Sequence, residues 1–327
     1  MTTAAAALLI LLAAPRPDWV DGMPAAFPRE RFVVAVGTAD DRAAAELRAR
    51  AGIAAFFESR IAAAARVEET EGHATANGLE LRVASLSARQ EVTAATAKLL
   101  EGAEIAEAWT DAEGRSWALA VLDRARATDA LRGRLAEVDA EVDALAARLG
   151  AETARFERAR LAHRIVSAAA RRPPVLADLR LLDPAAAQAP PAGVAKARAA
   201  AERALGEVGV AVRVAGEAAG PVGTAATRAI VSTGMRAVSA GAPHDLATIV
   251  DVEQAPAATD GAWAVARLTA RVRVLQGAGT EAVVTFVETA KGTSGRAEEA
   301  GRRAGEALAA RVEERLQVEL RGRLEGR

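Results

Sequence analysis

The first part of the chain alternates between strand-like and helix-like patterns of apolar residues. The run RFVVAVG (31–37) is short and apolar and ends in Gly, which is typical of a buried strand. From 41 to 68, apolar residues recur every three or four positions, and this spacing predicts a helix. Asp40 and Asp41 stand at its start, where a carboxylate can cap the first free N–H groups.

Two more strand signals follow before the middle of the chain. Strict alternation predicts a strand at 79–83, and a helical pattern covers 88–101. Residues 105–123 contain two strand-like runs around a small polar turn, which predicts a hairpin. In that hairpin Trp109 and Trp117 lie near one another across the pair.

The last part of the chain repeats this mixture of elements. The expected elements are a helix near 193–206, a strand at 208–214, a helix near 221–238, a strand at 248–254, a hairpin of 262–275 with 281–289, and a helix at 296–324. Strands and helices of this kind, with helices on one face of a sheet, predict an α+β fold. No sequence self-similarity is strong enough to indicate a repeat.

Residues 128–171 carry a different pattern, a heptad-like stripe of apolar residues over about three repeats. Its apolar positions are Leu131, Leu135, Val138, Val142, Leu145 and Leu149. Pro173 and Pro174 interrupt the helix. The stripe predicts either a helix that pairs with another copy or a hairpin that bends back on its own domain, and we assign it to a protein-partner interface.

These patterns divide the chain into two small α/β sandwich domains joined by a long, coiled-coil-like helical segment. The expected parts are a signal-like segment at 1–16, a first α+β domain at 17–127, a long helix or helical hairpin at 128–182, a linker at 183–193 and a second α+β domain at 194–327. The linker assignment rests on the run DPAAAQAPPAG, which consists of small residues and prolines.

Composition narrows the classes of function. The net charge is −1, which argues against a nucleic-acid partner because such proteins usually have a basic surplus. The chain has no Cys, so disulfides, thiolate metal sites, Cys nucleophiles and lipidation at Cys are excluded. Residues 4–14 form an apolar run of the length found in export signals, too short to span a bilayer, although the preceding residues carry no positive charge. The alternatives are a short buried helix or an incorrect start.

No arrangement of side chains predicts catalysis. The three His residues, at 73, 163 and 244, are far apart and lack the spacing of metal ligands. No Gly-rich loop has the spacing of a phosphate-binding motif, and no Ser lies in a nucleophile elbow. We therefore expect no enzyme activity, no cofactor, no metal and no small-molecule substrate. Arg267, Arg271 and Arg273 lie on one face of a predicted strand, where they form a candidate interface for a partner.

The segment PDWVDGMPAAFPRERFVVAVGTADDRAAAELRARAGIAAF (17–56) resembles the LPP-twenty lipoprotein family of bacterial envelopes, which includes flagellar outer-membrane proteins. The signature positions are Pro17, Trp19, Pro24 and Gly37, followed by an Ala-rich helix. The hairpin at 101–124 is similar to the closing hairpin of that family, so the resemblance covers about 17–125. It implies a scaffolding role in the periplasm or at the outer membrane. This chain departs from the pattern because it lacks the Cys that carries the lipid, so peripheral membrane contact would occur without lipidation. The second domain is vaguely similar to TolB N-terminal and penicillin-binding-protein-activator domains.

Taken together, the sequence predicts an exported, non-enzymatic structural or assembly protein of the cell envelope, in a flagellar or cell-wall context, that associates with a protein partner or with itself. The alternative is a periplasmic binding or activator module whose C-terminal domain recognises a partner protein, a peptide or a glycan. For the lead-in PRPDWVDGMP, we expect Trp19 to pack on the first domain and hold its first strand, the alternative being a partly exposed Trp on a linker.

Overall fold

The computed structural model describes residues 15–21, 24–71, 102–186, 191–256, 258–277 and 282–326, with side chains of the first long helix as far as residue 57. Their mixture of helices and strands agrees with the expected α+β class. Contacts divide the chain into two compact units, Met1–Glu137 with Arg171–Ala189, and Val138–Ala170 with Pro190–Arg327. The predicted strand at 79–83, the helix at 88–101 and almost all of the signal-like segment lie outside the described residues.

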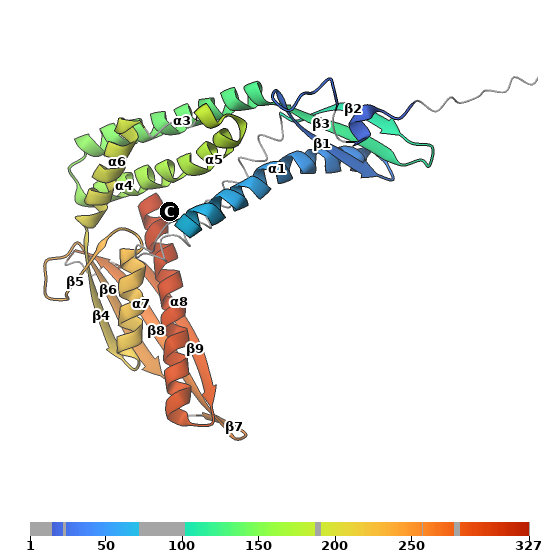
Figure 1. Cartoon of the computed structure of the whole chain (residues 1–327). Helices are drawn as coiled ribbons and strands as arrows, with labels where there is room; N and C mark the ends of the chain where they lie inside the picture. Colours follow the sequence, from blue (N-terminus) through green and yellow to red (C-terminus); the bar gives the residue numbers. More distant parts are fainter. Residues whose placement is uncertain are drawn as a thin grey trace, which may run out of the picture. The chain divides into compact units, whose positions relative to one another are not determined.

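The first unit contains a three-stranded antiparallel sheet. Its strands are β1 (Phe32–Ala39), β2 (Glu104–Thr110) and β3 (Ser116–Asp123), in the order β1-β3-β2. Trp109 lies directly opposite Trp117 in the β2–β3 hairpin, as the sequence predicts. Helix α1 (Arg42–Glu71) packs along one face of this sheet (Figure 1). Its start is capped as expected, because Asp41 Oδ1 accepts a hydrogen bond from the Ala44 amide at 2.8 Å.

A glycine sets how closely α1 approaches β1. A Cβ added at Gly37 would overlap the backbone of Ala45 and Ala49 on α1. Arg48 of the same helix donates a hydrogen bond to the carbonyl oxygen of Thr38 at 2.5 Å. Strand and helix are therefore joined by a close backbone contact and an adjacent side-chain hydrogen bond.

The second unit contains a larger mixed sheet. Its strands are β4 (Gly209–Gly216), β5 (Arg236–Val238), β6 (Leu246–Gln254), β7 (Ala258–Asp260), β8 (Trp263–Gln276) and β9 (Ala282–Ser294). Strand β4 runs parallel to β5 and β6, and β6 and β9 flank β8 in antiparallel fashion. Among the described strands, β9 is therefore an edge.

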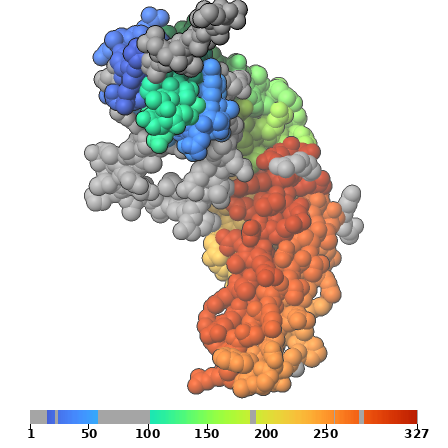
Figure 2. Space-filling view, turned by 90° about the vertical axis from the view of Figure 1, so that its right-hand side faces the viewer, coloured from blue at the N-terminus to red at the C-terminus, as the bar shows by residue number. Residues whose placement is uncertain are grey.

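Two helices cover one face of this second sheet. Helix α7 (Ala219–Val231) packs on β4, and α8 (Ala297–Glu325) packs on β8 and β9 (Figure 1). An ion pair joins the two helices, Arg228 to Glu313 at 2.6 Å. Figure 2 shows α8 in red beside the orange strands. Helices α4 (Arg155–Ala170) and α6 (Ala192–Gly206) pack on each other, and α4 also contacts α8.

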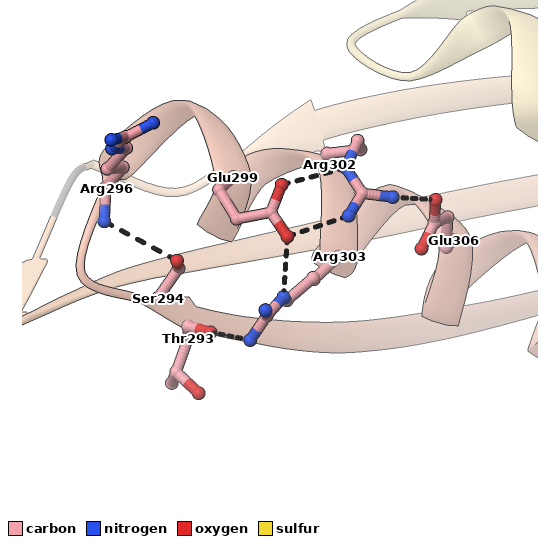
Figure 3. A network of polar contacts seen from close by, with 7 residues as sticks. All are labelled: Thr293, Ser294, Arg296, Glu299, Arg302, Arg303 and Glu306. Carbon is pink, nitrogen blue, oxygen red and sulfur yellow. Dashed lines mark hydrogen bonds and ion pairs between the residues drawn. The ribbon is translucent and has the colours of Figure 1, made fainter.

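The start of α8 is fixed to the end of β9 in the same way as α1 is fixed to β1. A Cβ at Gly292 would overlap the backbone of Ala300 and Ala304, and Arg303 donates to the carbonyl oxygen of Thr293 at 3.1 Å. Glu299, in the first turn, accepts hydrogen bonds from Arg302 and Arg303 (Figure 3). Those bonds, from Arg302 first and then Arg303, lower the pKa of Glu299 to about 2.

Residues 124–182 form three separate helices and not one long helix. Helix α3 (Arg124–Ala151) stops after the heptad stripe, and α4 begins four residues later. Arg158 of α4 donates hydrogen bonds to the carbonyl oxygens of Leu149 and Glu152, each at 3.2 Å, and so caps the end of α3. Helix α5 (Arg172–Leu182) follows. The chain has thus folded back, which is the second of the two arrangements that the stripe allowed.

Some element boundaries also differ from the sequence expectation. Residues 128–182 do not form a separate part of the structure. Helix α5 and the first half of α3 belong to the first unit, whereas α4 and the second half of α3 belong to the second unit. The helix expected near 221–238 ends at Val231, because Gly234 adopts a positive φ of 83° that turns the chain into β5. Helix α6 begins at Ala192, inside the expected linker.

The close contact at Gly292 predicts that any side chain at this position destabilises the protein. We expect Gly292→Ala to lower the free energy of unfolding by about 1–3 kcal/mol, because a Cβ there forces β9 and α8 apart. The matched control is Gly301→Ala on α8, where a Cβ meets nothing within 4 Å. That change should raise stability by up to about 1 kcal/mol through helix propensity. Urea denaturation followed by circular dichroism measures both, and equal effects of the two variants would contradict the close-contact argument.

Candidate functional site

The face of the second sheet opposite α7 and α8 is open to solvent over β6, β8 and β9. Along β8 the even-numbered residues from Ala266 to Val274 are buried under the helices. The odd-numbered residues of the same strand point the other way, and Arg267, Arg271 and Arg273 are exposed there. The three arginines that the sequence selects therefore share one exposed face, which we call the open face.

Two of these arginines are neutralised by carboxylates from the neighbouring strand. Arg271 donates a hydrogen bond to Glu253 at 2.5 Å, and Arg273 donates to Asp251 at 3.0 Å. Both pairs are about half exposed, so their contribution to stability is small. Their effect on the surface is larger, because they cancel the charge of most of the arginine row.

Arg267 is in a different situation. Its direct partner on β9 is Lys291, so two cations stand opposite each other across the β8–β9 pair. Neither has an ion pair within the part of the chain that the structure describes. Trp263, four residues before Arg267 on the same face of β8, is 58% exposed. Sequence reasoning missed Lys291 and Trp263; pairing the two predicted strands in register would have found the lysine.

The outer edge of β9 is partly covered by arginines of α8. The carbonyl oxygens of Thr289 and Thr293 accept hydrogen bonds from Arg311 and Arg303. The two threonines are four residues apart on one strand, so both carbonyls point to the same edge. A partner strand that adds to this edge would have to displace these side chains.

The heptad stripe does not form an open surface in the structure. Its six residues are all buried, with exposed fractions between 0% and 8%. Leu131 and Leu135 belong to the apolar cluster of the first unit, with Val175 and Leu179 of α5. Val142, Leu145 and Leu149 belong to the cluster of the second unit. The expected partner interface is thus occupied by the chain's own helices.

Trp19 packs against the face of the first sheet that α1 leaves free. The short helix η1 (Asp18–Asp21) carries it there, and its side chain is 1% exposed. It lies in a cluster with Leu119 and Val121 of β3, against which residues of β1 also pack. Its indole Nε1 donates a hydrogen bond to Glu107 on β2 at 2.7 Å. Trp19 therefore packs on the first domain, as expected, and its role in holding the first strand stays a prediction.

The other signature residues serve the same lead-in or the helix contact. The carbonyl oxygen of Pro17 accepts from the Val20 amide at 3.3 Å, and that of Pro24 accepts from the Phe27 amide at 3.1 Å. Gly37 gives the close approach of α1 to β1. Each signature position therefore has a local structural role in the first unit.

The titratable groups of the described residues include no cluster of potential metal ligands and two histidines that lie far apart in the sequence. In the described ranges no three His, Cys, Asp or Glu residues are grouped in a way that would hold a metal ion. His163 lies half-buried beside Glu325 at 3.9 Å; burial lowers its pKa, and the charge of Glu325 opposes that shift. His244 lies in a turn, where Nδ1 is 2.8 Å from the carbonyl oxygen of Ala242.

Asp178 of α5 is the most perturbed carboxylate in the first unit. Its side chain is 1% exposed, and Oδ1 has no hydrogen-bond partner. Burial raises its pKa to about 6, against a smaller opposing effect of the Arg134 charge. Because this carboxyl group is buried without a partner for Oδ1, we expect it to affect the stability of the fold.

Comparison with known proteins gives distant likenesses of fold. No family model and no curated protein matches the chain. Several solved structures do, among them the following two. One is a "putative lipoprotein" from Caulobacter crescentus CB15, 15% identical over 36% of this chain and 90% of that one, with a TM-score of 0.28. The other is the secreted protein HP1454 from Helicobacter pylori, 12% identical over 87% of this chain and 97% of that one, with a TM-score of 0.42. Both TM-scores are below 0.5, so no function is transferred from either protein.

The described helices were also compared with the requirements of a membrane span. None of them combines the length and the apolar character that crossing a bilayer demands.

The burial of Trp19 predicts a large effect of its removal. We expect Trp19→Ala to lower the free energy of unfolding of the first unit by about 3–5 kcal/mol, because the face of the sheet loses its cover. Trp263→Ala, at the exposed Trp, is the control and should change stability by less than about 0.5 kcal/mol. Urea denaturation of both variants tests this, and a neutral Trp19→Ala would show that the lead-in does not hold the sheet.

Asp178 predicts a dependence of stability on pH. Its pKa is higher in the folded state than in the unfolded state, so the folded protein favours the neutral carboxyl group. The free energy of unfolding should therefore be highest below the unfolded pKa and decrease as the pH rises from about 4 to about 6, by up to about 3 kcal/mol. Asp178→Asn should remove this decrease and make the protein more stable than the parent at pH 7. Urea midpoints at pH 4 and pH 7 give the comparison; parallel behaviour of the two proteins would contradict it.

Proposed function

We propose that this chain is a non-catalytic protein of the bacterial cell envelope that recognises a partner through the open face of its second sheet. The observation that carries the proposal is the exposed row of Arg267, Arg271 and Arg273 on a sheet whose other face is fully packed. A rigid sheet holds such side chains in fixed positions without an entropic cost for ordering the backbone.

The location in the envelope rests on the sequence of the first unit. The likeness of residues 17–125 to the LPP-twenty family is supported by the roles of Trp19 and Gly37, which are the packing roles that a family signature would preserve. The apolar run at 4–14 fits export of the chain. Because the chain has no Cys, contact with the outer membrane would be peripheral and would not involve a lipid group.

Recognition through the open face is favoured over assembly through a coiled coil. The heptad stripe is buried within the chain, so a second copy cannot pair with it unless the helices separate. The open face needs no such rearrangement. We also propose that the protein has no catalytic activity. The wide separation of the His residues in the sequence and the burial of Asp178 support this part of the proposal.

Two experiments test the proposal. The first is fractionation of the full chain expressed in a bacterium with an outer membrane: we expect it in the periplasmic or outer-membrane fraction, and an exclusively cytosolic protein would overturn the location.

The second experiment tests the surface. Envelope extracts are passed over the immobilised protein and over the variant Arg271→Glu/Arg273→Glu. The matched control is Arg198→Glu/Arg315→Glu on α6 and α8, where the arginines are similarly exposed and also paired. We expect bound material to be lost from the open-face variant only, because reversing these charges leaves unpaired carboxylates across the surface. Equal binding by all three proteins would refute recognition through this face.

A further inference from the structure

The cation pair on the open face is not explained by folding. Like charges directly opposite each other on neighbouring strands destabilise a sheet. Arg267 and Lys291 are such a pair, both are exposed, and neither is compensated by an ion pair among the described residues. Arg271 and Arg273 on the same face each have a carboxylate, so the uncompensated charge is confined to one position.

The surroundings of this pair are rich in hydroxyl groups. Thr269 and Thr289 lie next to it on the same face and contact each other at 3.1 Å, and Thr293 follows Lys291 by two residues. On the opposite side of the pair from the two threonines, Trp263 is the first residue of β8, and it is more than half exposed. Among the described residues of this face, Val287 is the other large exposed apolar side chain, whereas protein partners usually require several such anchors.

We propose that Trp263, Arg267 and Lys291 bind peptide-free glycan strands of the cell wall, with a sugar ring against Trp263 and a free sugar carboxylate between Arg267 and Lys291. The indole ring offers a flat apolar surface to the C–H face of a sugar, and the two cations donate charge-assisted hydrogen bonds to a carboxylate. This inference rests on the proposed function, since it names the partner of the same open face.

Spacing favours an oligosaccharide over a single sugar. Trp263 and Arg267 are four residues apart on one strand, which corresponds to about 13 Å. One ring cannot contact both, whereas a linear glycan that follows β8 can. A glycan in which neutral and carboxylated sugars alternate places a neutral ring at Trp263 and an acidic ring at the cation pair.

Other extended ligands fit less well. A peptide that adds as a strand would need the edge of β9, where Arg303 and Arg311 already bind the carbonyl oxygens of Thr293 and Thr289. A polyanion with a charge on every unit would pass from the cation pair to arginines that Glu253 and Asp251 have neutralised. One uncompensated cation pair matches a ligand whose acidic groups are widely spaced.

Titration of the full chain with two tetrasaccharides tests the inference. One is the peptide-free peptidoglycan tetrasaccharide in which N-acetylglucosamine alternates with N-acetylmuramic acid, so that each lactyl group is a free carboxylate. The other is chitotetraose, which has the same backbone without them. We expect the acidic tetrasaccharide to bind at least tenfold more tightly by calorimetry, the difference that one charge-assisted contact typically gives. Equal affinities, or no binding of either, would overturn the inference.

Variants assign the contacts. Arg267→Ala/Lys291→Ala should remove the preference for the acidic sugar, and Trp263→Ala should weaken both sugars about equally. Arg198→Ala/Arg315→Ala on α6 and α8 is the control away from the open face and should leave the affinities within twofold, because these arginines are exposed and paired with Glu202 and Glu319. Circular dichroism confirms that each variant is folded. A loss of binding in the control as large as that in Arg267→Ala/Lys291→Ala would contradict a local site.

Two comparisons separate this inference from the proposed function. A poly-glutamate peptide that competes as well as the acidic tetrasaccharide would overturn the choice of a glycan while leaving the open face as the binding surface. If the envelope pull-down depends on the open face but no glycan binds, the inference fails and the proposed function stands. If the protein binds the acidic tetrasaccharide but is found only in the cytosol, the proposed location fails and the glycan site stands.

Discussion

Both units depend on one kind of contact, the close approach of a long helix to the edge strand that precedes it. In each case a glycine of the strand lies against two alanines of the helix, and a Cβ at the glycine would overlap the helix backbone. The spacing is the same in both units: alanines follow the glycine by eight and twelve residues, and an arginine that follows by eleven donates to the carbonyl of the residue after the glycine. The residues are Gly37, Thr38, Ala45, Arg48 and Ala49 in the first unit, and Gly292, Thr293, Ala300, Arg303 and Ala304 in the second. This local repeat is too short to stand out in an Ala-rich sequence, but it fixes the helix on one face of each sheet.

The two sheets use their remaining faces in opposite ways. In the first unit that face is apolar: Leu119 and Val121 of β3 pack under Trp19. In the second unit the corresponding positions of the edge hairpin carry Arg267, Thr269, Thr289 and Lys291. The same strand–helix contact therefore occurs in both units. In the first it accompanies an apolar sheet face that must be covered, and in the second it accompanies a polar face that is stable in water. The two faces therefore differ in the chemistry of their side chains and not in their backbone geometry.

Much of this could be predicted from residue patterns, and the failures have physical reasons. The alternation in 262–275 fixes which side chains face outward, because the side-chain period of a strand is two, and it correctly placed Arg267, Arg271 and Arg273 on one face. The stripe from Leu131 to Leu149 is less informative, since the same apolar spacing suits a second copy or the chain's own α4 and α5. The continuity of α3 hides the division of the chain, because a helix that contributes to two cores has no break in its pattern. Lys291 was missed because its position depends on a pairing register that only a defined turn can set.

The outer edge of β9 is protected by side chains of the helix that packs on it. A strand of thirteen residues at the edge of a sheet invites pairing with another chain. In β9 the arginines of α8 occupy two of the carbonyl oxygens on that edge, and Arg48 does the same for Thr38 of β1. These arginines come from the helices that the glycine contacts hold in place, so the contact that builds each unit also covers its edge. The outer edge of β9 is thus partly covered and the heptad stripe is buried, whereas the open face of β6, β8 and β9 presents fixed side chains to solvent. The pair of Arg267 and Lys291 carries the uncompensated positive charge of that face.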